Sequence, residues 1–591
     1  MSASVTRVFD LLKYNQENFS KDEFISGKIN GEWVKYSTQR FCEVTNSLSK
    51  GLTTLGIGKG SRVAIMSTNR PEWNIGDYAT MQLGAYQIPL YPTLAEHDIK
   101  FILEDAEISV VFVGDKQLHE KISQVISEVK QEVKVYTFDK VEGANHWLEL
   151  VEIGNKAEVD LEAYREAVTS DDILTLIYTS GTTGTPKGVM LTHDNLVQNF
   201  KKSAVLLPPN VSHALSFLPL SHIFERMISY LYAYLNIATY YAESMETIVA
   251  DIQFVKPSGF STVPRLLEKV YDKIVEKGKA LTGIKKMIFF WSLSLAEKYD
   301  TDKSWWYTFK LGIARKLVFT KWQEALGGNI QVIISGGAAL NPRLARVFWA
   351  AGLPVFEGYG LTETSPVISV NHFDAIKFGS VGKPIEGVEV KIAEDGEILV
   401  KGHNVMKGYY NKPELTDEAI DKDGFFHTGD IGELTDGYLK ITDRKKEMFK
   451  TAGGKYVAPQ MIENKIKEAP LIEQIMVLGE NRKFPSALVV PNFEALKGWC
   501  KVKGIAYESN EAIVENKEVQ EKFHKLIDEA NKEFGKWEQV KQFALLPKEW
   551  SIDGGELTPK LSLKRKVILE KNKEIIEKIY KDAENYHPDA K

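Results

Sequence analysis

Short apolar runs that alternate with longer amphipathic runs constrain this fold more than any other feature of the sequence. Residues 62–67 (RVAIMS) are apolar, 71–85 (PEWNIGDYATMQLGA) have helical spacing with Pro71 at the start, and 86–92 (YQIPLYP) are again apolar. This order predicts a strand, a helix and a second strand. Other apolar runs that predict strands are 108–114, 174–178, 331–335 and 353–359. Repeated units of this kind indicate mainly parallel sheets with helices on both faces, which bind ligands at the carboxyl ends of their strands.

The character of the sequence changes after about residue 440. The 591 residues exceed one ordinary core and suggest two or three domains. The last part is richer in lysine and more helical, with strand-like runs at 474–479 and 486–491. We therefore predict an α/β fold with a large N-terminal domain, 1–444, of doubly wound, mainly parallel sheets with flanking helices and a smaller β subdomain. A small α+β C-terminal domain, 445–591, follows.

Composition excludes several classes of protein. A net charge of −6 gives no general attraction to nucleic acid. Two distant cysteines, Cys42 and Cys500, form no disulfide framework, so we expect buried thiols in a reducing compartment. Residues 1–20 contain no apolar leader core, and the apolar run 227–242 is shorter than the ~20 residues of a bilayer-spanning helix. We predict a cytoplasmic protein in which 227–242 is a core helix that runs into a strand.

The segment 282–325 is rich in aromatic residues and lysine and allows two interpretations. One is a helical insertion packed on the large domain. The other is a face that touches the inner surface of a membrane as a peripheral contact, because tryptophan and lysine at helical spacing suit a lipid surface. The sequence determines neither this contact nor the oligomeric state.

A loop of glycine, hydroxyl residues and one lysine follows the apolar run 174–178. Its sequence is YTSGTTGTPKGVM, residues 178–190. Glycines allow backbone amides to approach an anion, hydroxyls donate hydrogen bonds, and Lys187 supplies charge. We expect this loop to bind phosphate, through Thr179, Ser180, Gly181, Thr182, Thr183, Gly184 and Lys187. It is not a Walker A loop, because Pro186 precedes the lysine and Gly188 stands where serine or threonine would follow.

Five further motifs accompany this loop, and together they resemble the AMP-forming acyl- and aryl-ligases, the adenylate-forming superfamily. They are FLPLSHIFER (217–226), ISGGAAL (334–340), EGYGLTET (357–364), HTGD (427–430) and DRKKEMFKTAGGKYVAP (443–459). The resemblance covers residues 30 to 570. Within the superfamily, four features resemble long-chain fatty acyl-CoA synthetases most. They are VPRLLEKVYDKI, the long insertion 275–330, KTAGGKYVAP and GELTPKLSLKRK.

The resemblance implies a two-step reaction. A fatty acid carboxylate attacks the α-phosphorus of ATP to give acyl-AMP and pyrophosphate, with Mg²⁺ as cofactor. The thiol of coenzyme A then displaces AMP. The substrates supply both nucleophiles, so the protein must position anions and neutralise charge. One alternative is a ligase that loads an acyl group on a carrier protein. Another is a membrane-associated lipid-binding protein without activity, which the presence of Lys187, Glu363, Asp430 and Arg444 disfavours.

The resemblance also implies roles for individual residues. Glu363 is expected to ligate Mg²⁺ together with Thr183, and Thr362 to bond the α-phosphate. His222 is expected to line the entrance for the carboxylate or acyl chain. It is not expected to act as a base, because a carboxylic acid is already ionised near pH 7. The remaining residues expected to contact the nucleotide are Gly336, Gly337, Glu357, Gly358, Tyr359 and Gly360 at the base, and Asp430 and Arg444 at the ribose.

A C-terminal lysine and a mobile small domain complete what the resemblance implies. The family's ending contains a glycine before this lysine, which LTPKLSLKRK lacks. By position we assign Lys564 to the α-phosphate and substrate carboxylate, with Lys560 and Lys566 as alternatives. Lys446 falls at the family's hinge. Rotation there is expected to replace Lys564 with the coenzyme A-facing residues Gly453, Gly454 and Lys455.

Overall fold

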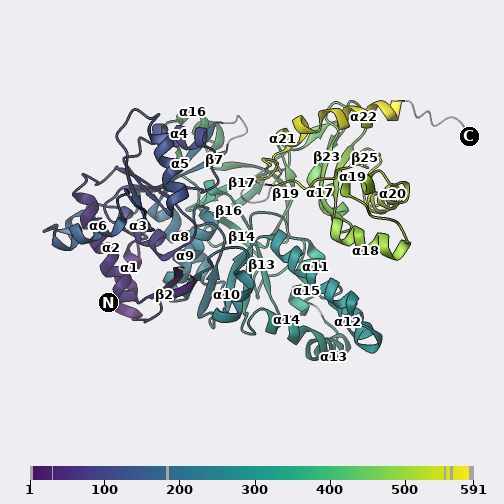
Figure 1. Cartoon of the computed structure of the whole chain (residues 1–591), viewed down its shortest axis with the longest axis horizontal. Helices are drawn as coiled ribbons and strands as arrows, with labels where there is room; N and C mark the ends of the chain where they lie inside the picture. Colours follow the sequence, from purple (N-terminus) through teal and green to yellow (C-terminus); the bar gives the residue numbers. More distant parts are fainter. Residues whose placement is uncertain are drawn as a thin grey trace, which may run out of the picture. The chain divides into compact units, whose positions relative to one another are not determined.

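The computed structural model describes residues 4–29, 31–180, 185–301, 303–551, 554–558 and 563–584 (Figure 1). Contacts divide the chain into two compact units. Unit 1 comprises Met1–Lys391, Leu399–His427 and Asp436–Leu439, and unit 2 comprises Ile392–Ile398, Thr428–Thr435 and Lys440–Lys591. The predicted boundary at 444–445 lies close to the point at which unit 2 becomes continuous. The hinge at Lys446 stays a prediction.

The larger sheet of unit 1 is parallel through its centre and antiparallel at both ends. Within the described residues it has nine strands in the order β15-β14-β13-β12-β11-β9-β10-β1-β2. The strands in that order are β15 Lys383–Pro384, β14 Val367–Val370, β13 Val355–Gly360, β12 Val332–Ser335, β11 Gly259–Thr262, β9 His213–Ser216, β10 Ala238–Tyr241, β1 Ile25–Ile29 and β2 Glu32–Tyr36. The five pairings from β13 to β1 are parallel, so these strands end at one edge.

The second sheet of unit 1 follows the same plan. Its order is β18-β8-β7-β4-β3-β5-β6. The bounds are β18 Gly408–Tyr409, β8 Pro186–Thr192, β7 Ile173–Ser180, β4 Tyr86–Leu90, β3 Arg62–Met66, β5 Val110–Val113 and β6 Lys134–Thr137. The pairings from β7 to β6 are parallel, whereas β7–β8 and β8–β18 are antiparallel. The phosphate-loop sequence therefore joins two antiparallel strands of this sheet.

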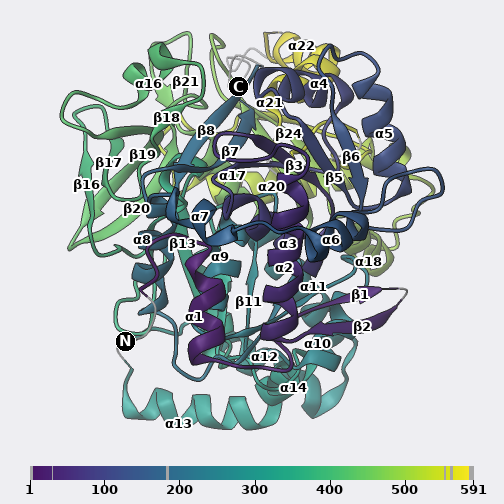
Figure 2. The ribbon, with the colours of Figure 1, turned by 90° about the vertical axis from the view of Figure 1, so that its left-hand side faces the viewer.

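Helices cover both sheets and also separate them (Figure 2). The helix α3, Pro71–Met81, is buried along its whole length and contacts β3 and β4 of one sheet and β1 of the other. A helix buried on all sides belongs to the core layer. The remaining helices of unit 1 are α1 Asp10–Asn18, α2 Thr38–Thr53, α4 Glu96–Asp105, α5 Lys116–Ile126, α6 Trp147–Lys156, α7 Leu161–Glu166, α8 His193–Ala204, α9 Ile223–Tyr234, α10 Ile248–Val255, α11 Pro264–Ala280, α12 Gly283–Ala296, α13 Trp305–Ala314, η1 (a π-helix) Arg315–Phe319, α14 Thr320–Ala325, α15 Pro342–Ala350, η2 (a 3₁₀-helix) Thr362–Thr364 and α16 Pro413–Ala419.

The sequence patterns predicted the central elements correctly. The strand, helix and strand expected over 62–92 are β3, α3 and β4, and the predicted strands 108–114, 174–178, 331–335 and 353–359 are β5, β7, β12 and β13. The apolar run 227–242 is confirmed as a helix, α9, followed by a strand, β10. The α/β fold class is thus confirmed.

A buried ion pair ties α3 and α9 to β7. The Arg226 guanidinium lies 2.5 Å from the Asp77 carboxylate, and both side chains are almost completely buried. Arg226 also donates to the hydroxyl of Thr175 on β7 at 2.8 Å. A buried charge pair is retained only when both partners stay satisfied. This network therefore fixes β7, which leads to the phosphate loop, against the middle layer.

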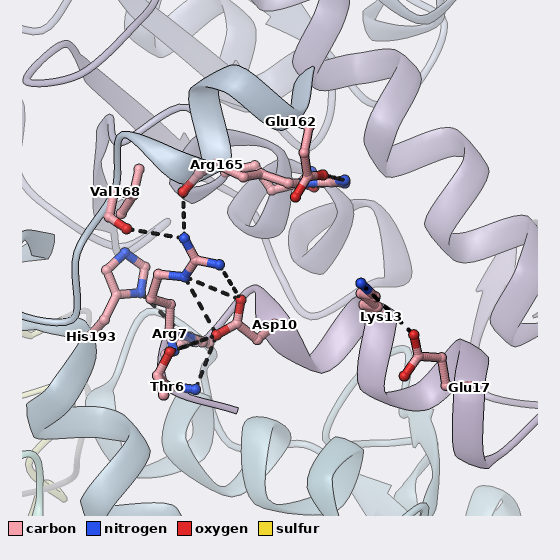
Figure 3. A network of polar contacts seen from close by, with 11 residues as sticks. Thr6, Arg7, Asp10, Lys13, Glu17, Glu162, Arg165, Val168 and His193 are labelled. Carbon is pink, nitrogen blue, oxygen red and sulfur yellow. Dashed lines mark hydrogen bonds and ion pairs between the residues drawn. The ribbon is translucent and has the colours of Figure 1, made fainter. Parts of the chain in front are cut away.

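Polar contacts also fix the N-terminal segment to residues near Val168 and His193 (Figure 3). The Arg7 side chain bonds to Asp10 at 2.8 Å and to the carbonyls of Arg165 and Val168, the latter at 3.0 Å. The backbone N–H of Val8 donates to Nδ1 of His193, at the start of α8, at 3.1 Å. Burial lowers the pKa of His193 to about 3, so this imidazole stays neutral and can accept that bond.

Unit 2 contains an α+β core. The strands β23 Ile472–Leu478 and β24 Ser486–Pro491 are antiparallel, and β25 Gln542–Leu545 joins β24 in parallel. The short strands β21 Phe449–Lys450 and β22 Tyr456–Val457 form a separate hairpin. The helices are α17 Pro459–Ile466, α18 Phe493–Lys503, α19 Asn510–Val514, α20 Lys517–Asn531, α21 Arg565–Lys571 and α22 Lys573–Glu584. Buried residues such as Ile475, Val489 and Phe523 form one core between them.

Four further strands form a sheet of their own, and the smaller β subdomain of the N-terminal domain stays a prediction. Its order is β16-β17-β19-β20, with bounds β16 Val388–Ile392, β17 Glu397–Gly402, β19 Phe426–Thr435 and β20 Tyr438–Arg444. The division between the units passes through this sheet.

The two cysteines and the apolar helices bear on expectations drawn from composition. Cys42 and Cys500 are free thiols and both are buried, as predicted. Burial raises the pKa of Cys42 to about 12, so this thiol is unreactive at neutral pH. In the part of the chain that the structure describes, none of the helices has both the length and the apolar character to traverse a bilayer.

Candidate functional site

The carboxyl edge of the nine-stranded sheet collects three of the sequence motifs of unit 1, those at 217–226, 334–340 and 357–364. The strands β9, β11, β12 and β13 are neighbours and run parallel. Their ends therefore place His222, Val263, Gly336 and the segment after Gly360 along one edge of the sheet. Ligands of open α/β sheets bind at this edge.

His222 marks the start of α9 at this edge. Its Nδ1 accepts the backbone N–H of Phe224 at 3.1 Å, which caps the helix. The ring of Phe224 packs against the loop after β12, because a Cβ on Gly336 would lie 3.2 Å from the Phe224 Cζ. The two motifs at 217–226 and 334–340 thus lie in contact.

A buried carboxyl group holds this end of α9 on the sheet. Glu225 accepts hydrogen bonds from Ser216 of β9 at 2.5 Å and from Ser261 of β11. Burial raises the pKa of Glu225 to about 7, and the two serine hydroxyls oppose that rise. The side chain joins the start of α9 to two neighbouring strands. Nothing in the residue pattern had singled out Glu225.

Glu357 on β13 holds the loop 336–340 through a hydrogen bond to its backbone. Its Oε1 accepts the backbone N–H of Leu340 at 3.0 Å, and burial raises its pKa to about 8. Gly360 closes the strand where no larger residue fits, because a Cβ there would lie 1.7 Å from the Pro366 carbonyl oxygen. Tyr359 and Thr362 are buried beside it.

Three side chains of unit 1 meet between the phosphate-loop strands and η2. The Lys187 ammonium lies 5.0 Å from the centroid of the Tyr409 ring. The Tyr409 hydroxyl donates to Oε1 of Glu363 at 3.1 Å. A cation, a hydroxyl and a carboxylate are thereby held in one row, although 222 residues separate Lys187 from Tyr409 in the chain.

The backbone of residues 406–410 holds this row together. The N–H of Met406 donates to the carbonyl of Glu363 at 2.8 Å, and the N–H of Tyr410 donates to the carbonyl of Gly188 at 2.8 Å. Tyr409 itself lies on β18, which pairs with β8 at Val189. Tyr409 could not be found from the sequence, because the short run that contains it carries no local sign of this long-range pairing.

The two residues expected at the ribose lie together in unit 2. Nε of Arg444, at the end of β20, is 3.6 Å from Oδ1 of Asp430 on β19. The Asp430 side chain is 9% exposed and that of Arg444 is 54% exposed, so the carboxylate is fixed while the guanidinium faces solvent. The N–H of Lys445 donates to the carbonyl of Gly429 at 2.8 Å, which holds the two strand ends side by side.

The expected hinge and coenzyme A-facing residues lie in exposed turns of unit 2. Lys446 is in the turn between β20 and β21. Gly453, Gly454 and Lys455 form the tip of the β21–β22 hairpin, where the N–H of Gly454 donates to the carbonyl of Thr451 at 2.9 Å. The Lys455 ammonium lies 5.7 Å from the centroid of the Trp537 ring.

Lys564 is exposed at the start of α21, and its neighbour Arg565 holds that start in place. The N–H of Lys564 donates to the carbonyl of Glu556 at 2.7 Å. Arg565 bonds to buried Glu463 at 2.5 Å, to Glu447 at 3.0 Å and to the Val477 carbonyl at 3.0 Å. The sequence singled out the lysines of this basic run but not Arg565, because its partners Glu447, Glu463 and Val477 are distant in the chain.

Some expected site residues lie outside the described residues. These are Gly181, Thr182, Thr183 and Gly184 of the phosphate loop and the alternative lysine, Lys560. Among the residues that the structure describes, no group of three or more His, Cys, Asp or Glu side chains could hold a metal ion by itself. Glu363 is partly exposed and offers a carboxylate, a hard oxygen donor of the type that Mg²⁺ prefers. Mg²⁺ is commonly held by one or two carboxylates with phosphate oxygens, so this residue fits the implied ion.

Family models match both parts of the chain. The model described as AMP-binding enzyme matches residues 12–410, and the model described as AMP-binding enzyme C-terminal domain matches 447–584. The first match contains Lys187, His222 and Glu363, and the second contains Lys564, whereas Asp430 and Arg444 lie between the two matched ranges.

Curated relatives extend over almost the whole chain. The long-chain-fatty-acid–CoA ligase FadD15 of Mycobacterium bovis is 35% identical, with 93% of each chain covered. The fatty acyl-CoA synthetase A of Dictyostelium discoideum is 31% identical, with 99% of this chain and 92% of the relative covered. Among solved structures, the A domain of the carboxylic acid reductase from Segniliparus rugosus, in complex with AMP and a co-purified carboxylic acid, has the same fold. Its TM-score is 0.74 and its identity 19%, over 98% of this chain and 94% of that one.

Proposed function

Because this chain belongs to the AMP-binding enzyme family, we propose that it activates a long-chain fatty acid with ATP and transfers the acyl group to coenzyme A. The observation that carries the proposal is the row Lys187–Tyr409–Glu363 beside the carboxyl edge of the nine-stranded sheet. A cation and a carboxylate held close together suit a triphosphate with its metal ion, and this supports the proposal. The relatives, which are named as fatty acid–CoA ligases, supply the substrate class.

The first step needs charge neutralisation more than it needs a protein nucleophile. A carboxylate oxygen of the fatty acid attacks the α-phosphorus, the bond from that phosphorus to the bridging oxygen breaks, and pyrophosphate leaves. Two anions must approach each other, and the leaving group gains charge. Lys187 and the loop from Thr179 neutralise the β- and γ-phosphates, while Thr362 donates to the α-phosphate.

Glu363 is the proposed ligand of the Mg²⁺ that accompanies ATP. When bound, that ion neutralises phosphate oxygens as pyrophosphate departs. Tyr409 donates to Glu363 Oε1 and fixes the orientation of the carboxylate. The partial exposure of Glu363 leaves room for phosphate oxygens beside it. The contribution of Thr183 stays a prediction.

His222 is proposed to line the path of the fatty acid. Its Nδ1 is occupied as a helix cap, and Glu225 holds the turn that carries it. The imidazole therefore offers a fixed surface. The segments 217–226, 258–265 and 334–340 lie at the ends of neighbouring strands and would surround the acyl chain.

Asp430 is proposed to accept both ribose hydroxyls, and its replacement tests this. We expect Asp430→Ala to raise the KM for ATP about tenfold or more, because hydrogen bonds to a charged group contribute about 1.5–3 kcal/mol each. The KM for the fatty acid should change little. Steady-state kinetics with each substrate varied in turn measure both values. Asp528→Ala, an exposed carboxylate on α20 of the same unit, is the matched control. An unchanged KM for ATP would remove Asp430 from the ribose site.

The two steps are proposed to use different segments of unit 2. Lys564 contacts the α-phosphate and the substrate carboxylate in the first step. In the second step the thiolate of coenzyme A attacks the acyl carbon, the bond to the phosphate oxygen breaks, and AMP leaves. The exposed hairpin tip with Gly453, Gly454 and Lys455 then lies along the coenzyme A, after rotation about Lys446.

Arg565 is proposed to position Lys564, because three hydrogen-bond acceptors hold its guanidinium. We expect Arg565→Lys to lower the rate of acyl-AMP formation about fivefold, since lysine cannot reproduce the planar fork of hydrogen bonds. The conversion of supplied acyl-AMP to acyl-CoA should stay unchanged. Rapid-quench assays of each half-reaction measure the two rates. An equal fall in both rates would indicate a general loss of structure instead.

The overall reaction separates the candidate functions. The protein is incubated with ATP, Mg²⁺, palmitate and coenzyme A, and we expect AMP, pyrophosphate and palmitoyl-CoA. Pyrophosphate exchange without thioester would indicate the carrier-protein alternative, which the names of the relatives support less. No turnover of ATP with any acid would indicate the inactive lipid-binding alternative. A panel of fatty acids of different length then defines the chain-length preference.

A further inference from the structure

The helices α12 and α13 expose an unusual number of large apolar side chains. On α13 and the turn that follows, these are Trp305 (75% exposed), Trp306 (53%), Phe309 (52%), Ile313 (39%) and Leu317 (50%). On α12 they are Ile284 (70%), Met287 (65%) and Trp291 (39%). We call these eight residues the α12–α13 face. Large exposed apolar side chains gathered on two contacting helices indicate an interaction site.

Helical spacing places these residues on defined stripes. At about 100° per residue, Trp305, Phe309 and Ile313 and their neighbours fall within about a third of the circumference of α13. Ile284, Met287 and Trp291 stand at positions i, i+3 and i+7 of α12, which also form one stripe. In Figure 2, α13 runs along the lower edge of unit 1. The stripes are thus a feature of regular helices.

Both helices are fixed to unit 1 by their other sides. Leu311 and Ala314 of α13 are buried, and the Tyr307 hydroxyl donates to the Leu295 carbonyl of α12 at 2.8 Å. Arg315, directly after α13, donates to the Ala350 carbonyl of α15 at 2.8 Å. The sides of α12 and α13 that pack on the core of unit 1 are therefore different from the exposed stripes. The exposed stripes are additional apolar surface without a use in the fold.

The aromatic side chains of the face form an ordered cluster. The ring of Phe309 lies 6.2 Å from that of Trp305 and 5.6 Å from that of Trp306, stacked on both. The Lys310 ammonium lies 5.5 Å from the centroid of the Trp306 ring. Tryptophan rings with lysines beside them are typical of the boundary between lipid headgroups and acyl chains.

The charge around the face is positive, although the whole chain carries −6. Residues 282–325 contain eight lysines and arginines and four acidic residues. Two of these acids are neutralised locally, since Glu297 pairs with Arg343 at 3.2 Å and Asp300 with Arg346 at 2.9 Å. Exposed lysines that flank the stripes are Lys285, Lys286, Lys303, Lys316 and Lys321. This arrangement complements a negatively charged surface.

A second copy of the chain is a less suitable occupant. A symmetric dimer through this face would oppose the same lysines to each other, and lysine is depleted in protein interfaces. A bilayer that contains anionic phospholipid satisfies both the aromatic rings and the lysines. We propose that the α12–α13 face docks on the surface of an anionic phospholipid bilayer, with the aromatic cluster at the depth of the headgroups. This proposal does not depend on the proposed reaction.

Vesicle co-sedimentation of the full chain tests the proposal. We expect the protein to sediment with phosphatidylcholine vesicles that contain phosphatidylglycerol, and more weakly with phosphatidylcholine alone or at high salt. The triple variant Trp305→Gln, Trp306→Gln, Phe309→Gln should bind the vesicles at least about tenfold more weakly than the wild type, because the inserted apolar area is lost. The matched control Val205→Gln, Met245→Gln, Val249→Gln changes three equally exposed apolar residues of unit 1 outside the face and should bind as the wild type does. Circular dichroism verifies that each variant is folded.

Depth is measured separately with brominated phospholipid, which quenches tryptophan within the bilayer. We expect quenching in the wild type and a large reduction of it in Trp305→Phe, Trp306→Phe, which keeps the apolar character of the face. Several results would overturn the proposal: wild-type protein that stays in the supernatant with both vesicle types, a glutamine variant that sediments like the wild type, or sedimentation velocity that shows a dimer lost in the glutamine variant without any vesicle binding.

Discussion

Replacement of Lys564 with alanine is expected to lower the rate of acyl-AMP formation about 10²–10³-fold and to leave the second step almost unchanged. The magnitude is that of removing one preorganised charge stabiliser from a transition state. The lysine is exposed at the start of α21, where Arg565 and the Glu556 carbonyl fix the backbone that carries it. A side chain presented in this way can enter a site in one step and leave it in the next.

The measurement separates the half-reactions. Pyrophosphate exchange reports acyl-AMP formation, and the conversion of synthetic acyl-AMP and coenzyme A to thioester reports the second step. Lys566→Ala is the matched control, because this lysine is also exposed and lies two residues away. It should keep both rates within about twofold, as surface substitutions usually do. A large loss in Lys566→Ala with none in Lys564→Ala would transfer the role to Lys566, and equal loss of both half-reactions in Lys564→Ala would contradict the alternation of segments.

Glu363→Gln is expected to lower the rate of acyl-AMP formation about 10²–10³-fold and to raise the Mg²⁺ concentration needed for half-maximal rate. Glutamine keeps the size of the side chain and an oxygen that can accept the Tyr409 hydroxyl. The substitution therefore removes the negative charge with little change in packing. The loss should be partly reversed at high Mg²⁺, since the ion would still bind through ATP.

Two further variants complete this test. Tyr409→Phe removes the hydroxyl that orients Glu363 and should reduce the rate only about three- to tenfold, the usual effect of one hydrogen bond. Glu386→Gln changes an exposed carboxylate of the same unit, which pairs with Lys202 at 2.6 Å, and should have no effect. Initial rates measured over a range of Mg²⁺ concentrations give, for each variant, the maximal rate of acyl-AMP formation and the Mg²⁺ concentration for half-maximal rate. A Glu363→Gln enzyme with the wild-type rate and Mg²⁺ requirement would show that the ion is held elsewhere.

Much of the fold could be predicted from local patterns, whereas the roles of the site residues stay predictions. Apolar runs and helical periodicity located β3, α3, β4 and β13. Asn341 followed by Pro342 marked the start of α15, where the asparagine side chain accepts the N–H of Arg343 at 2.9 Å. Such signals can be read because the interactions that produce them span only a few residues.

Residues that act through distant contacts could not be predicted. Tyr409 reaches Glu363 only because β18 pairs with β8, and Glu225 acts only because β9 and β11 are neighbours in the sheet. Arg565 lies in a basic run whose lysines are solvated, and only the folded unit 2 gives it Glu463 and Glu447. Whether each of these contacts forms depends on which strands and helices become neighbours in the fold. No short stretch of sequence contains that information.

The sequence by itself determined which chemistry the chain can perform, because glycines, hydroxyls, Lys187, Glu363 and Asp430 stand in an order that resembles one superfamily. Only the tertiary structure decided how these groups are held. It placed Lys187, Tyr409 and Glu363 in one row and left the aromatic cluster of α13 exposed. The physical reason is that residue chemistry is local, whereas burial, ion pairing and exposure follow from which strands and helices pack together.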